Sequence, residues 1–269
     1  MSDPTQTSET LSDVLDPARM AALQVLLDLS DTAAPGQALA PFFHQIYFWA
    51  PQRAQELGRD GHPRVGGGLI PDLGLPRRMW AGGRLAFRAP LRAGQLAQRR
   101  SVVETVTRKT GRTGPLGFVT LRHEISQNGA LAVCEWQDLV YREDPKPDAP
   151  AVQITPARRD ETHCIDRQFD ATQLFRYSAL TFNGHRIHYD LDYAREVEGY
   201  AGLVVHGPLL AQYLMLMACD LMGPLTGFAF RARSPLVHTE TAEFCANGSD
   251  FWVRGPDGRV CMTATATPL

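Results

Sequence analysis

Strand-like stretches of apolar and polar residues occupy the later part of the first half of the chain. They are rich in β-branched and aromatic residues, and Asn128-Gly129 between the last two is typical of a two-residue hairpin turn. Asp16 followed by Pro17 predicts the start of an earlier helix, because this pair suits a cap and a first helical position. We expect the polar residues 1–13 to be disordered. The expected strands are residues 83–89, 96–108, 116–126 and 130–142.

The second half is built around one strongly apolar segment, residues 207–222. Its apolar residues go nearly all the way round a helical wheel, which predicts a helix buried on most sides. Residues 170–180 indicate a short helix, and residues 191–200 a short amphipathic segment. Three strand-like segments close the chain: residues 227–236, 239–256 and 259–269.

A proline-rich stretch divides the chain. Residues 143–160 carry four prolines, which suit neither a helix interior nor a central strand, so they are expected to form a linker. This gives residues 1–142 as an N-terminal unit and residues 161–269 as a C-terminal unit. Each unit ends in antiparallel strands, which predicts an α+β fold of curved sheets around a helix. In the first unit the matching helix, residues 42–57, is interrupted by a proline and is expected to be degenerate.

Composition narrows the function classes. The chain has 269 residues, 44% of them hydrophobic, and a formal net charge of −2, so it offers no basic patch for nucleic acid. The five cysteines are scattered, without metal-ligand or disulfide spacing. No apolar run is long enough for a membrane helix, and the start lacks the features of a secretory signal. We therefore expect a cytoplasmic protein.

Candidate chemistry gathers just before the apolar segment. Residues 177–190 read YSALTFNGHRIHYD, and His206-Gly207-Pro208 opens the expected helix. Proton-transfer groups on a loop beside backbone N–H donors at a helix start are what a thioester-processing site needs.

These stretches resemble a known family. Residues 75–87 (LPRRMWAGGRLAF), 177–190 and 202–212 (GLVVHGPLLAQ) are similar to the double hot dog acyl-thioester hydratases and dehydratases, the MaoC-like or (R)-hydratase group. The resemblance is strongest to the FAS1-like dehydratase branch, whose members hydrate mesaconyl-C4-CoA and itaconyl-CoA; residues 228–236 match more weakly. It implies a double hot dog fold, an acyl-CoA or acyl-ACP substrate, no metal or organic cofactor, and a homodimer.

The resemblance also suggests roles for single residues. His188 falls on the family's catalytic histidine, and a histidine of near-neutral pKa can take and return a proton. Asn183 stands where the wider group has an aspartate, and His185 where it has an asparagine. We expect Asn183 to hold water or an imidazole, His185 to be a second proton carrier or an orienting partner, and Asp190 to fix a histidine tautomer. A metal at His185, His188 and Asp190 is not expected, because no helical HExxH context exists.

Backbone N–H groups at the helix start are expected to bind the thioester oxygen. Pro208 has no N–H, so Gly207 and Leu209 or Leu210 are the candidate donors. Further candidates for contact with substrate or for bracing are His206, Tyr177, Arg186, Trp80, Arg231 and Arg233.

Taken together, the sequence predicts a hydro-lyase that adds water reversibly to an unsaturated acyl-CoA, most simply a short branched or dicarboxylic one. Two alternatives stay open. One is a (3R)-hydroxyacyl-ACP dehydratase of fatty-acid or polyketide synthesis. The other is a non-catalytic module that binds acyl thioesters, which the amide at Asn183 favours.

Overall fold

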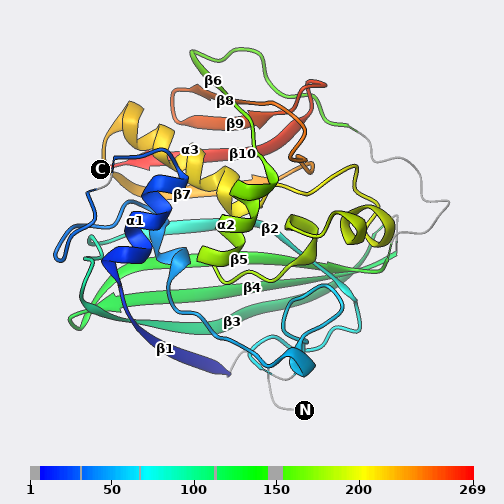
Figure 1. Cartoon of the computed structure of the whole chain (residues 1–269), viewed down its shortest axis with the longest axis horizontal. Coiled ribbons are helices and arrows are strands. Elements are labelled where there is room, and N and C mark those ends of the chain that lie inside the picture. Colours follow the sequence, from blue (N-terminus) through cyan, green and yellow to red (C-terminus); the bar gives the residue numbers. More distant parts are fainter. Residues whose placement is uncertain (1–6, 31, 67, 112–113, 145–153) are drawn as a thin grey trace.

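One antiparallel sheet organises the protein. The structure, a computed structural model, describes residues 7–30, 32–66, 68–111, 114–144 and 154–269. Within them ten strands lie in the order β1-β3-β4-β5-β2-β7-β10-β9-β8-β6 (Figure 1). The strands are β1 (Ser8–Val14), β2 (Arg77–Phe87), β3 (Leu96–Gly111), β4 (Gly114–Gln127), β5 (Ala130–Arg142), β6 (His163–Arg167), β7 (Leu225–Ala232), β8 (Ala242–Asn247), β9 (Asp250–Arg254) and β10 (Val260–Pro268).

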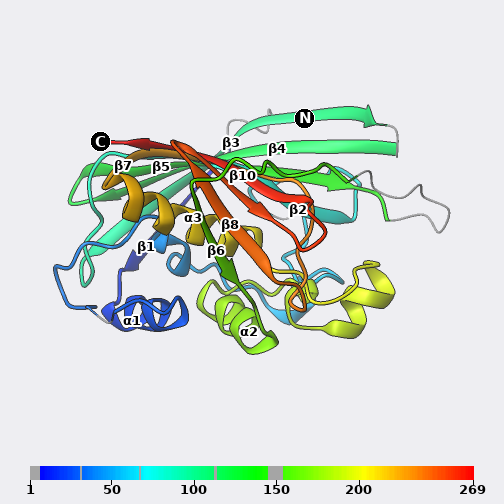
Figure 2. The same cartoon turned by 90° about the horizontal axis from the view of Figure 1, so that it is seen from above.

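The main helices cover one face of this sheet (Figure 2). They are α1 (Pro17–Leu26), α2 (Ala171–Leu180) and α3 (Gly207–Met222). α3 packs on β2, β7, β9 and β10, with Leu209, Leu214 and Met215 fully buried, so the prediction of a buried helix is confirmed with the same bounds. No helix in the described ranges is long and apolar enough to cross a membrane. The arrangement is the expected α+β double hot dog.

The two halves of the chain meet where β2 pairs with β7. This pairing needs a glycine, because a Cβ at Gly82 would lie 2.6 Å from the carbonyl oxygen of Phe230. The close approach makes the sheet continuous. It also brings Trp80 to the start of α3, where a Cβ on Gly207 would lie 3.9 Å from the Trp80 carbonyl oxygen.

The first half has no long helix opposite α3 in the described residues. The segment expected to be degenerate contains only two 3₁₀ turns, η2 (Phe43–Ile46) and η3 (Ala54–Glu56). Phe42 and Phe48 flank η2 with φ of 72° and 60°, a left-handed backbone that a continuing α-helix does not allow. This segment still packs beside α3, since Gln212 Nε2 donates to the carbonyl oxygen of Pro41 at 3.0 Å.

Local signals in the sequence identified several elements correctly. Asp16 caps α1 by accepting the N–H of Ala18 at 2.9 Å. Asn128 and Gly129 both have positive φ, 52° and 79°, as a type I′ hairpin turn requires. The strand expected at residues 130–142 has those bounds, whereas β2 begins six residues before the expected start at residue 83.

Two predictions about irregular segments need correction or stay open. Residues 8–13 are not disordered, because they belong to β1, which pairs with β3 over seven residues. β6 was not expected at all. Of the expected linker, residues 145–153 lie outside the described residues, as do residues 1–6 of the expected disordered start.

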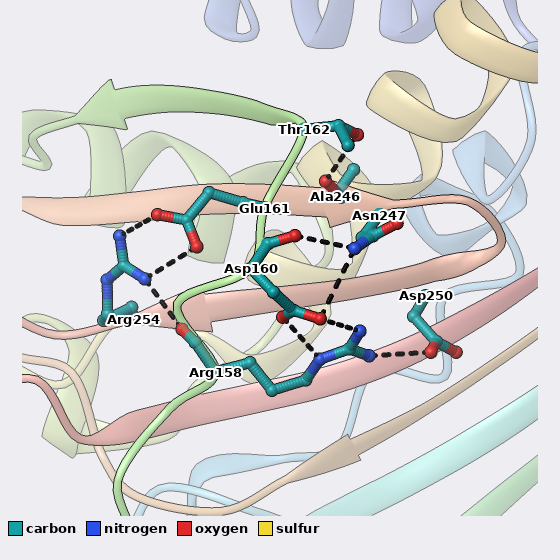
Figure 3. Close-up of polar contacts among 8 residues, drawn as sticks. All are labelled: Arg158, Asp160, Glu161, Thr162, Ala246, Asn247, Asp250 and Arg254. Carbon is teal, nitrogen blue, oxygen red and sulfur yellow. Dashed lines mark hydrogen bonds and ion pairs between the residues drawn. The ribbon is translucent and has the colours of Figure 1, made fainter.

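The last residues of the expected linker and Glu161 are fixed to the β8–β9 hairpin by ion pairs (Figure 3). Arg158 binds Asp160 and Asp250, at 2.8 and 2.7 Å. Arg254, whose side chain is buried, binds Glu161 at 2.7 Å and also donates to the carbonyl oxygen of Arg158. These contacts set the path by which the chain enters β6 and then α2.

Candidate active site

The loop after α2 carries two of the expected site histidines. α2 starts at its cap, Asp170, whose carboxylate accepts the N–H of Gln173 at 2.7 Å. It ends where Phe182 takes a positive φ of 51°, which turns the chain away from the helix axis. The 3₁₀ turn η4 (Arg186–His188) follows, so His185 and His188 lie side by side below the start of α3.

His188 is held in one tautomer by the backbone. Its Nδ1 lies 2.7 Å from the carbonyl oxygen of Val204, so Nδ1 carries the proton and donates it. Nε2 then keeps its lone pair and is free to act as a base. Burial lowers the pKa of His188 to about 3, although the hydrogen bond to Val204 opposes the shift. The imidazole is therefore neutral at pH 7.

His206 stacks on His188 at the start of α3. The two ring centroids are 3.6 Å apart with an interplanar angle of 19°. His206 is completely buried, and its Nε2 lies 2.8 Å from Ser178 Oγ. Its Nδ1 has no hydrogen-bond partner among the described residues. Burial, and then the charges of His188 and His185, hold the pKa of His206 well below its ordinary value. Tyr177 packs its ring edge against His206 and so buttresses the stack.

His185 extends the row of rings from the other side. Its ring meets His188 edge to face, with centroids 5.3 Å apart. The side chain of Asn183 accepts the backbone N–H of His185 at 3.1 Å and so shapes the turn that presents the ring. Burial, followed by the charge of His62, lowers the pKa of His185 far below its ordinary value.

A fourth histidine, His62, joins the row from the first half of the chain. The sequence gave no reason to single it out, yet its ring lies 4.4 Å from that of His185. Its Nδ1 is 3.0 Å from Asp60 Oδ2, and Asn183 contributes a side-chain hydrogen bond as well. Burial lowers the pKa of His62 to about 4, with Arg78 adding to the shift and Asp60 opposing it. We call His62, His185, His188 and His206 the site cluster.

Two glycines lock the loop of His62 onto the loop of His185. A Cβ on Gly61 would lie 2.0 Å from the carbonyl oxygen of Gly184, and one on Gly184 would lie 2.7 Å from that of Gly61. Arg186 strengthens the contact, because its backbone N–H donates to the carbonyl oxygen of Asp60 at 2.9 Å. The site cluster is therefore assembled from both halves of the chain. The run Asp60-Gly61-His62 is the local feature that marks this loop, but by itself it does not indicate a place in the site.

At the start of α3, one of the backbone N–H groups expected to bind a substrate oxygen is not available. The N–H groups of Leu209 and Leu210 both donate to the carbonyl oxygen of His206, at 3.0 and 3.1 Å. Neither is free for a substrate oxygen, so the expectation for Leu209 is corrected. Gly207 is the first residue of α3, and its N–H has no acceptor within the helix. It remains the candidate donor at this position.

Several candidate residues lie outside the cluster. The carboxylate of Asp190 binds Arg186 at 2.7 Å and accepts the N–H of Tyr193 at 3.0 Å, so the acceptor that fixes the His188 tautomer is Val204 instead. Arg231 is exposed and alternates with the buried Phe230, which places it on the sheet face opposite α3.

The remaining two candidates, Arg233 and Trp80, differ in where they lie relative to the site cluster. Arg233 follows the end of β7 and is exposed, so the structure does not bring it to the cluster. Trp80 lies beside the start of α3, with its ring packed against Phe42 and Phe230 at 6.3 Å each. Its indole Nε1 donates to the carbonyl oxygen of Gly82, which fixes the ring.

One part of the cluster has the composition of a metal site. Ligating atoms of Asp60, His62 and His185 lie within 4.8 Å of one another, and both histidines are neutral at pH 7. The hydrogen bond between Asp60 and His62 already uses the nearest pair of these atoms. Asp60 is thus hydrogen-bonded to His62, and the ring of His62 packs against that of His185.

Comparisons with known proteins place these features in a family. The model of the family described as hydroxyacyl-thioester dehydratase type 2 matches residues 42–238, which include every member of the site cluster. The mesaconyl-C(4)-CoA hydratase of Chloroflexus aurantiacus is 42% identical over 268 residues, covering 97% of this chain and 94% of that protein.

Solved structures agree on the fold. HtdX of Mycobacterium tuberculosis aligns with a TM-score of 0.69 at 16% identity, covering 98% of this chain and 100% of the other. A second protein of that organism, described as having a double hotdog fold, aligns with a TM-score of 0.56 at 14% identity, covering 97% and 95%. At such low identity the likeness shows the architecture alone.

Proposed function

The chain belongs to the hydroxyacyl-thioester dehydratase type 2 family, and we propose that it reversibly hydrates a short unsaturated dicarboxylic acyl-CoA such as mesaconyl- or itaconyl-CoA. As a family member it is a hydro-lyase acting on an acyl thioester. The narrower substrate is supported by the relative named mesaconyl-C(4)-CoA hydratase.

One observation carries the proposed mechanism: a buried, neutral His188 beside the free N–H of Gly207. Nε2 of His188 takes a proton from water as the water oxygen forms a bond to Cβ. The C=C electrons move to the thioester oxygen, where the N–H of Gly207 and the positive end of α3 stabilise the charge. The proton that His188 took is then returned to Cα, directly or through the neighbouring rings, which restores the thioester carbonyl and the neutral imidazole.

The second proton carrier, in this proposal, is His62 supported by Asp60. Asn183 replaces the carboxylate of the wider family, and an amide cannot accept a proton. Asp60 brings a carboxylate to the same loop from the first half of the chain, bound to His62 at 3.0 Å. His185 lies between His62 and His188 and connects them. Asp60 acts through His62 and is a positioning residue.

An assay on purified protein tests the function. Crotonyl-, mesaconyl- and itaconyl-CoA are each mixed with enzyme, and loss of the enoyl-thioester absorbance is followed. We expect hydration of at least one diacid thioester, with a higher kcat/KM than for crotonyl-CoA. No absorbance change with any of the three would contradict the proposal. The homodimer and the cytoplasmic location remain predictions from the family resemblance.

A further inference from the structure

A pocket shares a wall with the site cluster. Its volume is about 320 Å³, at the small end of the range for ligand sites. It is lined by the loop around His62, by the start of β2 and by the end of β5. Its lining includes Arg59, Asp60, His62, Leu75, Arg78 and Tyr141. Asp60 and His62 therefore face the pocket and also take part in the proposed proton transfer.

The pocket contains a buried hydroxyl whose O–H has no acceptor. Tyr141 is only 1% exposed, its oxygen is within hydrogen-bonding reach of Arg78, and its O–H donates to no group among the described residues. Burial raises the pKa of Tyr141, while the nearby Arg78 opposes the shift, so the two side chains are neighbours. A buried donor without a partner costs free energy in the empty protein. A ligand atom that accepts from it would remove that cost.

Among the described residues Arg78 forms no ion pair with a carboxylate, and Asp60 is the carboxylate that its charge reaches. Asp60 feels its charge, but the oxygens of Asp60 accept from His62. The adjacent Arg77 shows the contrast: it is buried in an ion pair with Glu198. Arg59, on the pocket rim, is likewise paired with Asp144. The pocket thus keeps one guanidinium and one hydroxyl available.

We propose that Arg78 and Tyr141 bind the free carboxylate of the acyl group, which makes the enzyme select diacid thioesters. This rests on the proposed function. A guanidinium and a phenol O–H are complementary to a carboxylate, and the planar fork of arginine favours two-point binding. Leu75 gives the pocket an apolar side for a short carbon chain or a methyl branch. The small volume suits a few carbons and excludes a long acyl tail.

Two variants test the proposal: Tyr141→Phe and Arg78→Gln. Tyr141→Phe is the sharper one, because the hydroxyl contacts only Arg78 and its O–H has no acceptor, so its loss should change the stability of the fold little. We expect each variant to lower kcat/KM for mesaconyl-CoA about 10- to 100-fold, mainly through KM, with crotonyl-CoA changed less than about 3-fold. Arg100→Gln, which removes an exposed cation of β3 paired with Glu124, is the matched control and should leave both substrates unaffected.

The outcomes distinguish carboxylate binding from other roles that Arg78 could have. Equal losses on both thioesters would overturn it, since Arg78 would then act on the CoA moiety or on the pKa values of the histidines. An unchanged preference for the diacid would overturn it too. If the wild type hydrates neither thioester, the proposed function fails, and calorimetric binding still decides the carboxylate site. Wild type should then bind mesaconyl-CoA more tightly than crotonyl-CoA, and Tyr141→Phe should abolish that difference.

Discussion

The protein contains two groups of buried histidines that differ in how their hydrogen bonds are satisfied. In the first half, His44 lies 2.9 Å from Glu135, and Gln45 donates to both oxygens of the same carboxylate. His123 in this group bonds Ser101 at 2.7 Å. We call His44, His123, Glu135, Gln45 and Ser101 the first-half cluster. The site cluster has no carboxylate except Asp60 at its edge, and one ring nitrogen of His206 has no partner.

In the proposed mechanism, this difference separates a structural network from a catalytic one. In the first-half cluster each charged or polar group meets a partner, and burial of Glu135 is offset by His44 so that its pKa is lowered. Such satisfied networks hold a fold in place. Among the described residues, Nε2 of His188 and the N–H of Gly207 have no protein partner, and the site cluster borders a pocket at His62. Unsatisfied groups in that position are suited to a substrate.

The largest expected effect comes from His188→Ala. It should lower kcat for hydration by about 10²- to 10⁴-fold, the range for a general base, because the Val204 carbonyl fixes the tautomer that leaves Nε2 of His188 as the proposed base. The enoyl-thioester assay measures the rate. His123→Ala is the matched control: it removes an equally buried ring from the first-half cluster and should keep kcat per folded molecule within about 3-fold. Equal rate losses in both variants would break the distinction.

Glu135→Gln should have the opposite profile. The buried carboxylate, which accepts from His44 and Gln45, is replaced by a neutral amide, and losing hydrogen bonds to a charged group costs about 1.5–3 kcal/mol of unfolding free energy. Urea denaturation followed by circular dichroism measures the loss. The folded variant should keep its kcat. A stable Glu135→Gln protein with strongly reduced kcat would assign the first-half cluster to catalysis.

Most of the fold could be predicted because its elements carry local signals. The cap at Asp16, the turn at Asn128 and the apolar wheel of α3 each act within a few residues. The two strands that were missed, β1 and β6, are the edges of the sheet, and their residues are mostly exposed. Backbone hydrogen bonds to β3 hold β1, and backbone hydrogen bonds to β8 hold β6. Because backbone bonds do not depend on side-chain type, the two sequences show no alternation of apolar and polar residues from which a strand could be predicted.

The part of the site whose residues are close in sequence could be predicted, and the part that only a tertiary contact brings near could not. His185, His188, His206 and Gly207 come together as expected, because one loop and one helix start carry them. His62 was missed, since only the Gly61–Gly184 contact brings it near. Leu209 is not available as a donor, because its N–H donates to the carbonyl oxygen of His206 in the first turn of α3. That the assembled groups perform catalysis stays a prediction.

Asp60→Asn should have an intermediate effect on the site cluster alone. The carboxylate accepts from His62 and raises its pKa, so its loss should make His62 a weaker proton carrier. We expect kcat to fall about 10-fold with KM unchanged, and the acid limb of the pH–rate profile to move. Asp72→Asn, on the same pocket but not bonded to a histidine, is the control. A change confined to KM would show that Asp60 binds substrate instead.

The smallest effect is a pH dependence of stability. Burial lowers the pKa of His188 to about 3, below the ordinary 6.5 that it regains on unfolding. Between these values the unfolded chain binds a proton that the folded chain does not, so stability falls as the pH drops below 6.5. The slope is about 1.4 kcal/mol per pH unit for each such histidine. Glu135, whose pKa is lowered from 4.5, adds its own loss of stability only at still lower pH.

Urea denaturation of wild type and His188→Gln between pH 6.5 and 4.5 measures this dependence. The free energy of unfolding of the variant should change with pH less steeply, by about 1.4 kcal/mol per pH unit. Identical slopes would mean that His188 is protonated in the folded enzyme, and its role as a neutral base would have to be abandoned.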